Sequence, residues 1–113
     1  MFGHERFEAY QISIQFLQLA LSLVEQLPKG NAHLREQLKR AAISIPLNIA
    51  EGSGKMEKSD RLRFYSIARG SAMECAAICD VILLIDDRLS ISAKEAKALL
   101  ESVTKILTVV CNK

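Results

Sequence analysis

Several residue types that define other protein classes are scarce. The sequence has no tryptophan, two prolines and three cysteines, and aromatic residues make up 5% of its 113 residues. An odd number of cysteines without a framework spacing argues against a small secreted disulfide scaffold. No stretch approaches the roughly 18 uncharged apolar residues of a membrane-spanning helix, and no secretory signal pattern is present at the start. We therefore expect a cytoplasmic protein without membrane contact.

Residues that carry enzyme or metal chemistry are also few. His4 and His33 have no partner at ligand spacing, and no Ser–His–Asp or Cys–His arrangement emerges. Cys75 and Cys79 lie four residues apart on one expected helix, but structural zinc needs four ligands and no second pair is present. The glycines at 52 and 54 lack the spacing of a phosphate-binding loop. We predict no catalytic residue, no cofactor and no metal, and we interpret the two thiols as core residues.

Apolar residues, in contrast, make up 50% of the chain, and most of them are leucine, isoleucine and alanine, which favour helices. They recur three and four positions apart in four segments, with short breaks between them. This pattern predicts helices over about 5–27, 31–52, 59–86 and 92–111. The length suits one domain over residues 1–113. Short connections predict an all-α, antiparallel, up-and-down four-helix bundle.

Local signals refine these helices. Asn31 is a good N-cap residue for the second helix. Pro46 removes one backbone donor inside that helix, which predicts a kink there. Ser92 and Glu95 have the spacing of a capping box, which predicts that the fourth helix opens at this point.

The first three helices carry apolar residues on two sides. In the first, one set at helical spacing forms one face: Phe7, Tyr10, Ile14, Leu17, Leu21 and Val24. A second set lies on another side: Ile12, Phe16, Leu19, Leu23 and Leu27. A surface helix of a monomer normally shows one stripe, so the surplus predicts self-association. Closed cyclic symmetry is the usual form of such an oligomer.

Positive charge is concentrated in the middle of the chain. The formal net charge is only +2, but residues 35–69 contain eight basic and four acidic side chains. A local basic excess attracts phosphate backbones, although an ordinary solvated face produces the same pattern. No aromatic residues interleave with the basic ones, so any nucleic-acid binding is expected to depend on phosphates and on salt. The candidate contacts are Arg35, Lys39, Lys55, Lys58, Arg61 and Arg69.

Polar residues also border the expected core of the second and third helices. Because an unpaired polar group beside a core costs about 1–3 kcal/mol, we interpret them as a structural network. Arg40 or Arg63 is expected to bridge to Glu51 or Glu74, and Asn48 to satisfy backbone freed by the proline. The full set is Arg40, Ser44, Asn48, Glu51, Arg63, Ser71 and Glu74.

Two runs of the sequence resemble those of a known family. Residues 37–54 read QLKRAAISIPLNIAEGSG and residues 63–74 read RFYSIARGSAME. Both resemble signature stretches of the four helix bundle protein family, which includes proteins encoded in intervening sequences of bacterial 23S ribosomal RNA. The resemblance spans residues 7–110. It implies an up-and-down bundle assembled as a cyclic pentamer.

The same family is similar to the accessory proteins of diversity-generating retroelements, which are basic pentameric barrels. That similarity implies nucleic-acid binding, with a reverse transcriptase or a ribosomal component as partner. The residues and the resemblance together favour a non-enzymatic homo-oligomer that binds RNA or DNA phosphates. The alternative is a protein–protein scaffold without nucleic-acid contact, which the small net charge favours.

Overall fold

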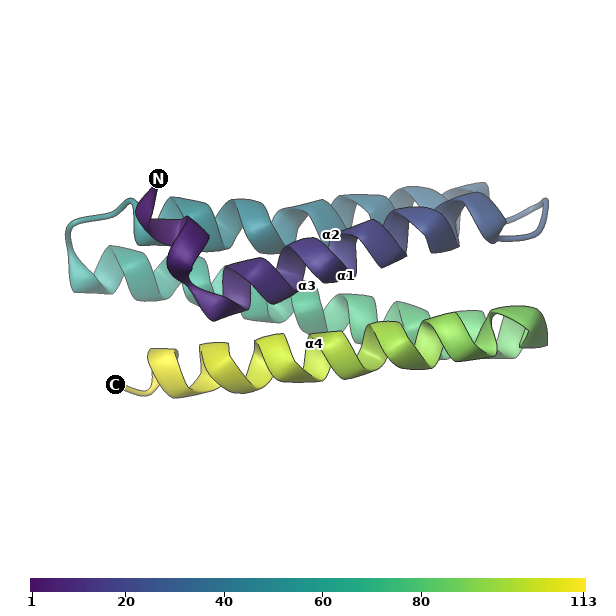
Figure 1. The fold of residues 1–113 in the computed structure, drawn as a ribbon. Coiled ribbons are helices and arrows are strands. Elements are labelled where there is room, and N and C mark those ends of the chain that lie inside the picture. The colour runs from purple at the N-terminus through teal and green to yellow at the C-terminus, as the bar shows by residue number, and fades with distance from the viewer.

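The computed structural model describes all residues 1–113 and contains four α-helices and no strands (Figure 1). The helices are α1 (Glu8–Gln26), α2 (Ala32–Ser53), α3 (Lys58–Ile85) and α4 (Ser90–Cys111). Two short 3₁₀ turns, η1 (Gly3–Arg6) and η2 (Asp87–Leu89), precede α1 and α4. The predicted all-helical fold class is confirmed.

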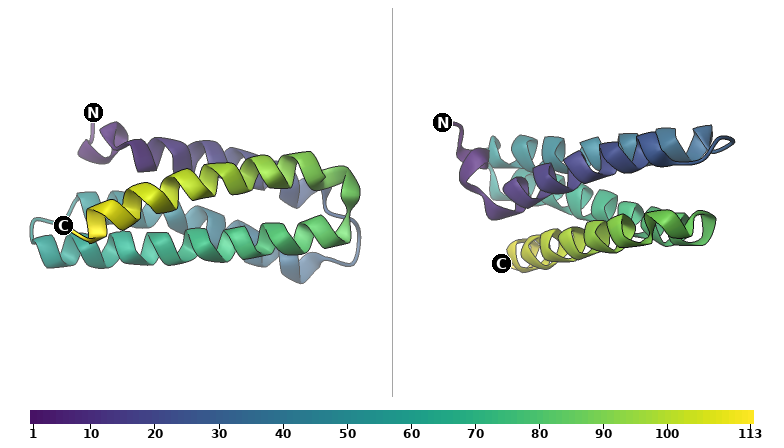
Figure 2. Two further views of the ribbon diagram at one scale, coloured as in Figure 1. Left: turned by 90° about the horizontal axis from the view of Figure 1, so that it is seen from below. Right: turned by 45° about the vertical axis from the view of Figure 1, so that its right-hand side comes forward.

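The four helices lie side by side and alternate in direction. Each packs against the helix before and after it, and α4 closes the ring against α1. The chain turns between α1 and α2 and between α3 and α4 at one end, while both termini and the α2–α3 loop lie at the other (Figures 1 and 2). The result is a rod of 45 × 23 × 21 Å. No helix in it combines enough length with enough apolar character to span a membrane.

The core of α1 is formed mainly by the second of its two apolar sets. Phe16 and Leu23 are fully buried, together with the small Ala9 and Ala20, whereas Ile14 of the first set is 41% exposed. Other members of the first set, among them Leu17, are partly buried and pack against this core. The alanines on the buried side let the neighbouring helices approach closely.

In the other helices the apolar spacing predicts one main stripe each, and the structure buries part of each stripe. The stripe of α2 runs from Leu34 to Ile49 and supplies Leu38, Ala41, Ile45 and Ile49 to the core. Leu47, which belongs to a second set with Ile43 and Ala50, is exposed. The stripe of α3, which runs from Phe64 to Ile85, is buried only at Cys75, Ile78 and Ile82. The stripe of α4, which runs from Ala96 to Val110, supplies Ala96, Leu100, Val103 and Leu107 to the core.

The first and the fourth helix begin at other residues than predicted. The first helix begins at Glu8 rather than near residue 5, because Phe7 has extended backbone that separates it from η1. The predicted capping box is wrong: α4 begins at Ser90, and Ser92 lies inside the helix. The η2 turn runs directly into α4, so the chain needs no side-chain cap there.

Pro46 lies inside α2, which continues as one helix from Ala32 to Ser53. The ring is buried, on a helix side that also carries core residues. Without an amide hydrogen, Pro46 leaves the carbonyl of Ala42 without its helical donor. The kink expected there stays a prediction.

Candidate interaction surfaces

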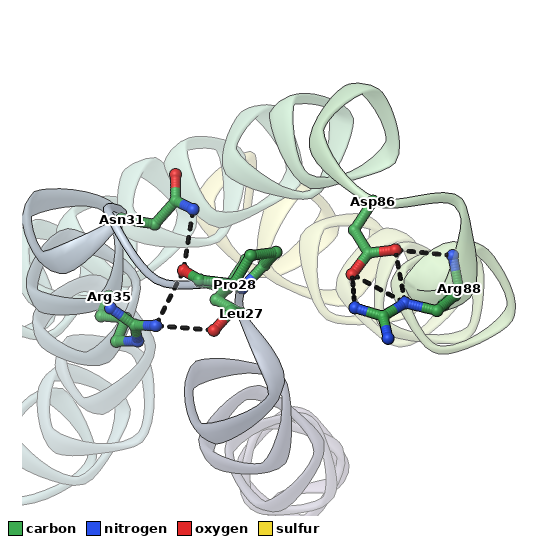
Figure 3. Close-up of polar contacts among 6 residues, drawn as sticks. All are labelled: Leu27, Pro28, Asn31, Arg35, Asp86 and Arg88. Carbon is green, nitrogen blue, oxygen red and sulfur yellow. Dashed lines mark hydrogen bonds and ion pairs between the residues drawn. The ribbon is translucent and has the colours of Figure 1, made fainter.

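Arg35 has a structural partner that sequence reading missed. Its guanidinium donates to the carbonyls of Leu27 at 2.6 Å and Pro28 at 2.9 Å (Figure 3). It also donates through Nε to the carbonyl of Val24 at 3.2 Å. These carbonyls belong to the last turn of α1 and the residues after it, where helical donors run out. A cation there also interacts favourably with the helix dipole. Arg35 therefore holds the α1–α2 turn together. Its guanidinium, which was expected to contact phosphate, is bonded to the chain itself.

Three other candidate basic residues gather around the α2–α3 loop, each with a partner. Lys55 pairs with Glu51 at 3.2 Å. The Lys58 ammonium donates to the carbonyl of Lys113 at 2.9 Å. Arg61 donates through Nη1 to the carbonyl of Met56 at 2.7 Å and, more weakly, to that of Lys55 at 3.4 Å. Three side chains that were predicted to bind phosphates therefore form structural contacts around this loop.

The last two candidates lie on different helices. Arg69 is half-buried and donates through Nε to the Thr108 hydroxyl on α4 at 2.7 Å. Lys39 is exposed on α2 and forms no ion pair. Because α2 is about 33 Å long at ~1.5 Å per residue, Arg35 and the loop group stand at opposite ends of the rod. The six residues do not form one surface within a single chain.

The predicted polar network forms in part. The Asn48 amide donates to the Ser44 carbonyl at 2.8 Å and to its hydroxyl at 2.9 Å. The Ser44 and Ser71 hydroxyl oxygens lie 2.9 Å apart and join α2 to α3. Since Ser44 accepts from Asn48, its own proton is available to Ser71. Asn48 does not reach the carbonyl that Pro46 leaves free.

The charged members of that set do not bridge one another. Glu51 pairs with Lys55 instead, and Glu74 accepts a weak bond of 3.4 Å from Gln37. Arg63 lies over the Phe64 ring at 4.5 Å from its centroid. Neither Arg63 nor Arg40 forms an ion pair within the chain. Both are exposed, so solvation costs less than holding two long side chains together.

A surface with apolar and unpaired charged residues runs along α2 and α3. Leu47 is 63% exposed and Ile67 is 43% exposed. Leu47 lies three residues after Ser44, and Ile67 lies four residues before Ser71. Since the two serines are in contact and the helices are antiparallel, both aliphatic side chains fall in the same stretch. We call this surface the α2–α3 face, and its members are Arg40, Ser44, Leu47, Asn48, Ile67, Ser71 and Glu74.

A second feature, which we call the terminal pocket, lies at the end of the rod that holds both termini. It is open and has a volume of about 460 Å³. The Ser53 and Tyr65 hydroxyl oxygens there lie 2.9 Å apart, and the Phe7 and Tyr65 ring centroids lie 5.5 Å apart. Sequence reading missed it because its parts come from distant segments. The lining residues are Gly3, Arg6, Phe7, Ser53, Arg61, Tyr65 and Val110.

The cysteines pack as expected. Cys75 and Cys79 are buried in α3, and Cys111 is partly exposed. Burial is the main cause that raises the pKa of the Cys75 thiol to about 12 and that of Cys79 to about 11. Both thiols are therefore protonated at neutral pH, which suits packing rather than reaction or metal binding.

Charged pairs elsewhere fasten the opposite end of the rod. Asp86 accepts from the Arg88 backbone amide and guanidinium, at distances from 2.8 to 3.3 Å (Figure 3). The hydrogen bonds from Arg88 lower the pKa of the Asp86 carboxyl. On the α3–α4 side, Asp80 binds Lys97 and thereby raises the pKa of that ammonium group. These charges hold the turn and the helix pair.

Comparison with known proteins agrees with this fold. A family model described as 23S rRNA-intervening sequence protein matches residues 5–111. The match covers both signature runs and all four helices. No curated protein sequence matches the chain.

Proposed function

The chain belongs to the 23S rRNA-intervening sequence protein family, and from this premise we propose that it acts without catalysis, as a homo-oligomer that binds RNA or DNA phosphates. The observation that carries the proposal is the α2–α3 face, where exposed aliphatic side chains lie between charges that form no ion pair in the chain. The family resemblance implies five copies.

The α2–α3 face has the composition of an interface between copies. Leu47 and Ile67 supply apolar area that water covers in an isolated chain. Arg40 and Glu74 are exposed charges of opposite sign, and neither forms an ion pair within the chain. In a ring of five, this face packs against a different face of the neighbouring copy, whose exposed charges supply partners for both residues. Ser44 lies between them already hydrogen-bonded, so its burial leaves no polar group unsatisfied.

Replacing Leu47 with glutamate is expected to dissociate the oligomer, because it puts an unpaired charge where an apolar side chain is buried between copies. Light scattering after size-exclusion chromatography gives the mass of each variant and the number of copies in the wild type. Leu84→Glu is the matched control, since Leu84 is 89% exposed and lies at the far end of α3. A wild type that stays monomeric at high concentration contradicts the proposal. If only Leu84→Glu prevents assembly, the interface lies outside the α2–α3 face.

Nucleic-acid binding is supported by the side chains whose charge remains accessible. Lys39 is exposed without an ion pair, and Lys58 is exposed with a single bond to a carbonyl. One chain offers few such charges, but a cyclic oligomer repeats each of them around the ring. Repetition converts weak single contacts into useful avidity when one strand reaches several copies.

The combined variant Lys39→Gln, Lys58→Gln is expected to bind structured RNA more weakly at low salt and to show a shallower salt dependence. Each phosphate contact contributes a slope of about −0.7 to −0.9 to log K against log salt, so losing two contacts per RNA-bound chain reduces the slope by about 1–2. Titration of labelled RNA at several salt concentrations measures both quantities. Lys94→Gln removes an exposed, unpaired lysine outside the basic segment and serves as control. Absence of wild-type binding at low salt refutes the proposal.

A protein–protein scaffold without nucleic-acid contact is the second candidate. One observation favours it: five of the six candidate basic residues are engaged by groups of the chain itself. A partner protein retained after nuclease treatment, by an oligomer that does not bind bare RNA, distinguishes this function from the first.

A further inference from the structure

The terminal pocket gathers residues from four separate parts of the chain, three of which supply side-chain donors. Arg6 comes from η1, Ser53 from the end of α2, Arg61 and Tyr65 from the start of α3, and Val110 from the end of α4. No carboxylate lines it. Two guanidinium groups at one pocket without an acidic neighbour in its wall create a local positive potential.

Both guanidinium groups have donors to spare. Arg61 uses Nη1 for the carbonyls of the α2–α3 loop, which fixes the side chain, while its Nε and Nη2 have no hydrogen-bond acceptor in the chain. The Arg6 side chain forms neither a hydrogen bond nor an ion pair in the chain. A guanidinium fork with free N–H groups matches the geometry of an oxyanion.

The hydroxyl pair in the same pocket supplies a further donor. Ser53 and Tyr65 each carry one hydroxyl proton, and only one proton lies between their oxygens at 2.9 Å. The other proton is available to an acceptor in the pocket. The rings of Phe7 and Tyr65 form an apolar wall beside these donors, which lowers the local dielectric and strengthens a charge-assisted bond.

We propose that the terminal pocket binds a phosphate group. Two guanidinium groups and a hydroxyl come from different elements, so an anion with acceptor oxygens in several directions suits them better than a flat carboxylate. A phosphate group offers enough oxygens and the higher charge. The volume of about 460 Å³ and the open mouth leave room for the remainder of a phosphorylated molecule. Where that molecule is RNA or DNA, the inference rests on the proposed function.

The chain provides its own probe for this site. It has no tryptophan and two tyrosines, of which only Tyr65 lines the pocket. Tyr10→Phe therefore leaves Tyr65 as the sole source of tyrosine fluorescence, and the phenylalanine ring retains the edge contact that Tyr10 forms with His4. Titration of this variant with inorganic phosphate, at ionic strength held constant with chloride, reports on the pocket alone.

We expect a saturable change in Tyr65 fluorescence with phosphate and none with chloride. Adding Arg6→Gln is expected to weaken phosphate binding about tenfold, since it removes one charge-assisted contact. Arg6 precedes α1, and its side chain forms no hydrogen bond or ion pair with the chain. The substitution therefore leaves the fold intact, which circular dichroism verifies. Lys94→Gln, with the same change of charge far from the pocket, is expected to bind phosphate unchanged. No saturable response, or equal affinity in the Arg6→Gln variant, overturns the inference.

RNA added to the phosphate-loaded protein separates this inference from the proposed function. Displacement of phosphate from Tyr65 identifies a nucleic-acid phosphate as the ligand. Phosphate binding by an oligomer that does not bind RNA supports the pocket, assigns it to small phosphorylated molecules and refutes the nucleic-acid function. RNA binding without any phosphate response at Tyr65 refutes the pocket and leaves the nucleic-acid function standing.

Discussion

Phe16→Ala is expected to lower the free energy of unfolding by about 3–5 kcal/mol, the usual cost of deleting a fully buried aromatic side chain. Phe16 is the largest side chain with no exposure in the core. Its removal leaves a cavity among helices that small residues hold close together, such as Ala9 and Ala20 on the same helix, so the site has little freedom to collapse. Because a domain has a total stability of about 5–15 kcal/mol, the loss is a large part of the whole. Chemical denaturation followed by circular dichroism measures it.

Leu21→Ala is the control for this prediction, because Leu21 belongs to the other apolar set of α1 and is 39% exposed. It removes an apolar side chain from the same helix, with a smaller expected cost. Any part of that cost that depends on protein concentration reports on assembly rather than on the core. If both variants lose the same free energy of unfolding at every protein concentration, the side of α1 that carries Phe16 is not its core side.

The fold was predictable because the apolar spacing and the short connections leave few alternatives to a bundle. The core side of α2 was predictable as well, since its large aliphatic residues concentrate on one side. On α1 the two sides carry similar numbers of large apolar residues. The choice between them depends on how closely the neighbouring helices approach, which the alanines determine. Periodicity measures spacing and contains no information on that distance.

The polar contacts were predictable only where they are local in sequence. Asn48 and Ser44 lie four residues apart on one helix, so their hydrogen bond follows from helix geometry. The partner of Arg35 is a set of carbonyls at the end of the preceding helix, which no side-chain pattern reveals. Arg6 was missed because it lies outside residues 35–69, where the basic excess is concentrated, and its importance arises only from the pocket that four elements form.

The basic residues differ in function according to the partners they have in the fold. Arg35, Arg61 and Arg69 hold loops and helices together, so replacing them tests stability as much as binding. Lys39 and Arg6 have no such role, which makes them the informative positions for phosphate binding. A charge count along the sequence treats all of these residues alike, and only their partners in the fold separate them.

Gly52→Ala is expected to destabilise the protein by about 2 kcal/mol, against the general preference of helices for alanine. A Cβ atom at this position would lie 2.8 Å from Cε1 and 2.9 Å from Cδ1 of Tyr65, and 3.0 Å from the carbonyl oxygen of Arg61. The ring and the backbone resist displacement, since the Tyr65 hydroxyl is bonded to Ser53 and the carbonyl belongs to α3. Overpacking of this kind costs about 1–3 kcal/mol. Alanine in place of glycine gains ~1 kcal/mol in the middle of a helix and less near its end, so the cost of overpacking is larger than the gain.

Gly70→Ala is the matched control, because Gly70 lies within α3 and a Cβ atom there would have no atom within 4 Å. That variant is expected to be more stable by about 0.5–1 kcal/mol, from the smaller conformational freedom of its unfolded chain. Thermal and chemical unfolding of both variants measures the opposite signs. Because Tyr65 borders the terminal pocket, Gly52→Ala is also expected to weaken phosphate binding, while Gly70→Ala leaves it unchanged. Stabilisation by both substitutions would show that α2 and α3 do not approach each other as closely as Gly52 allows.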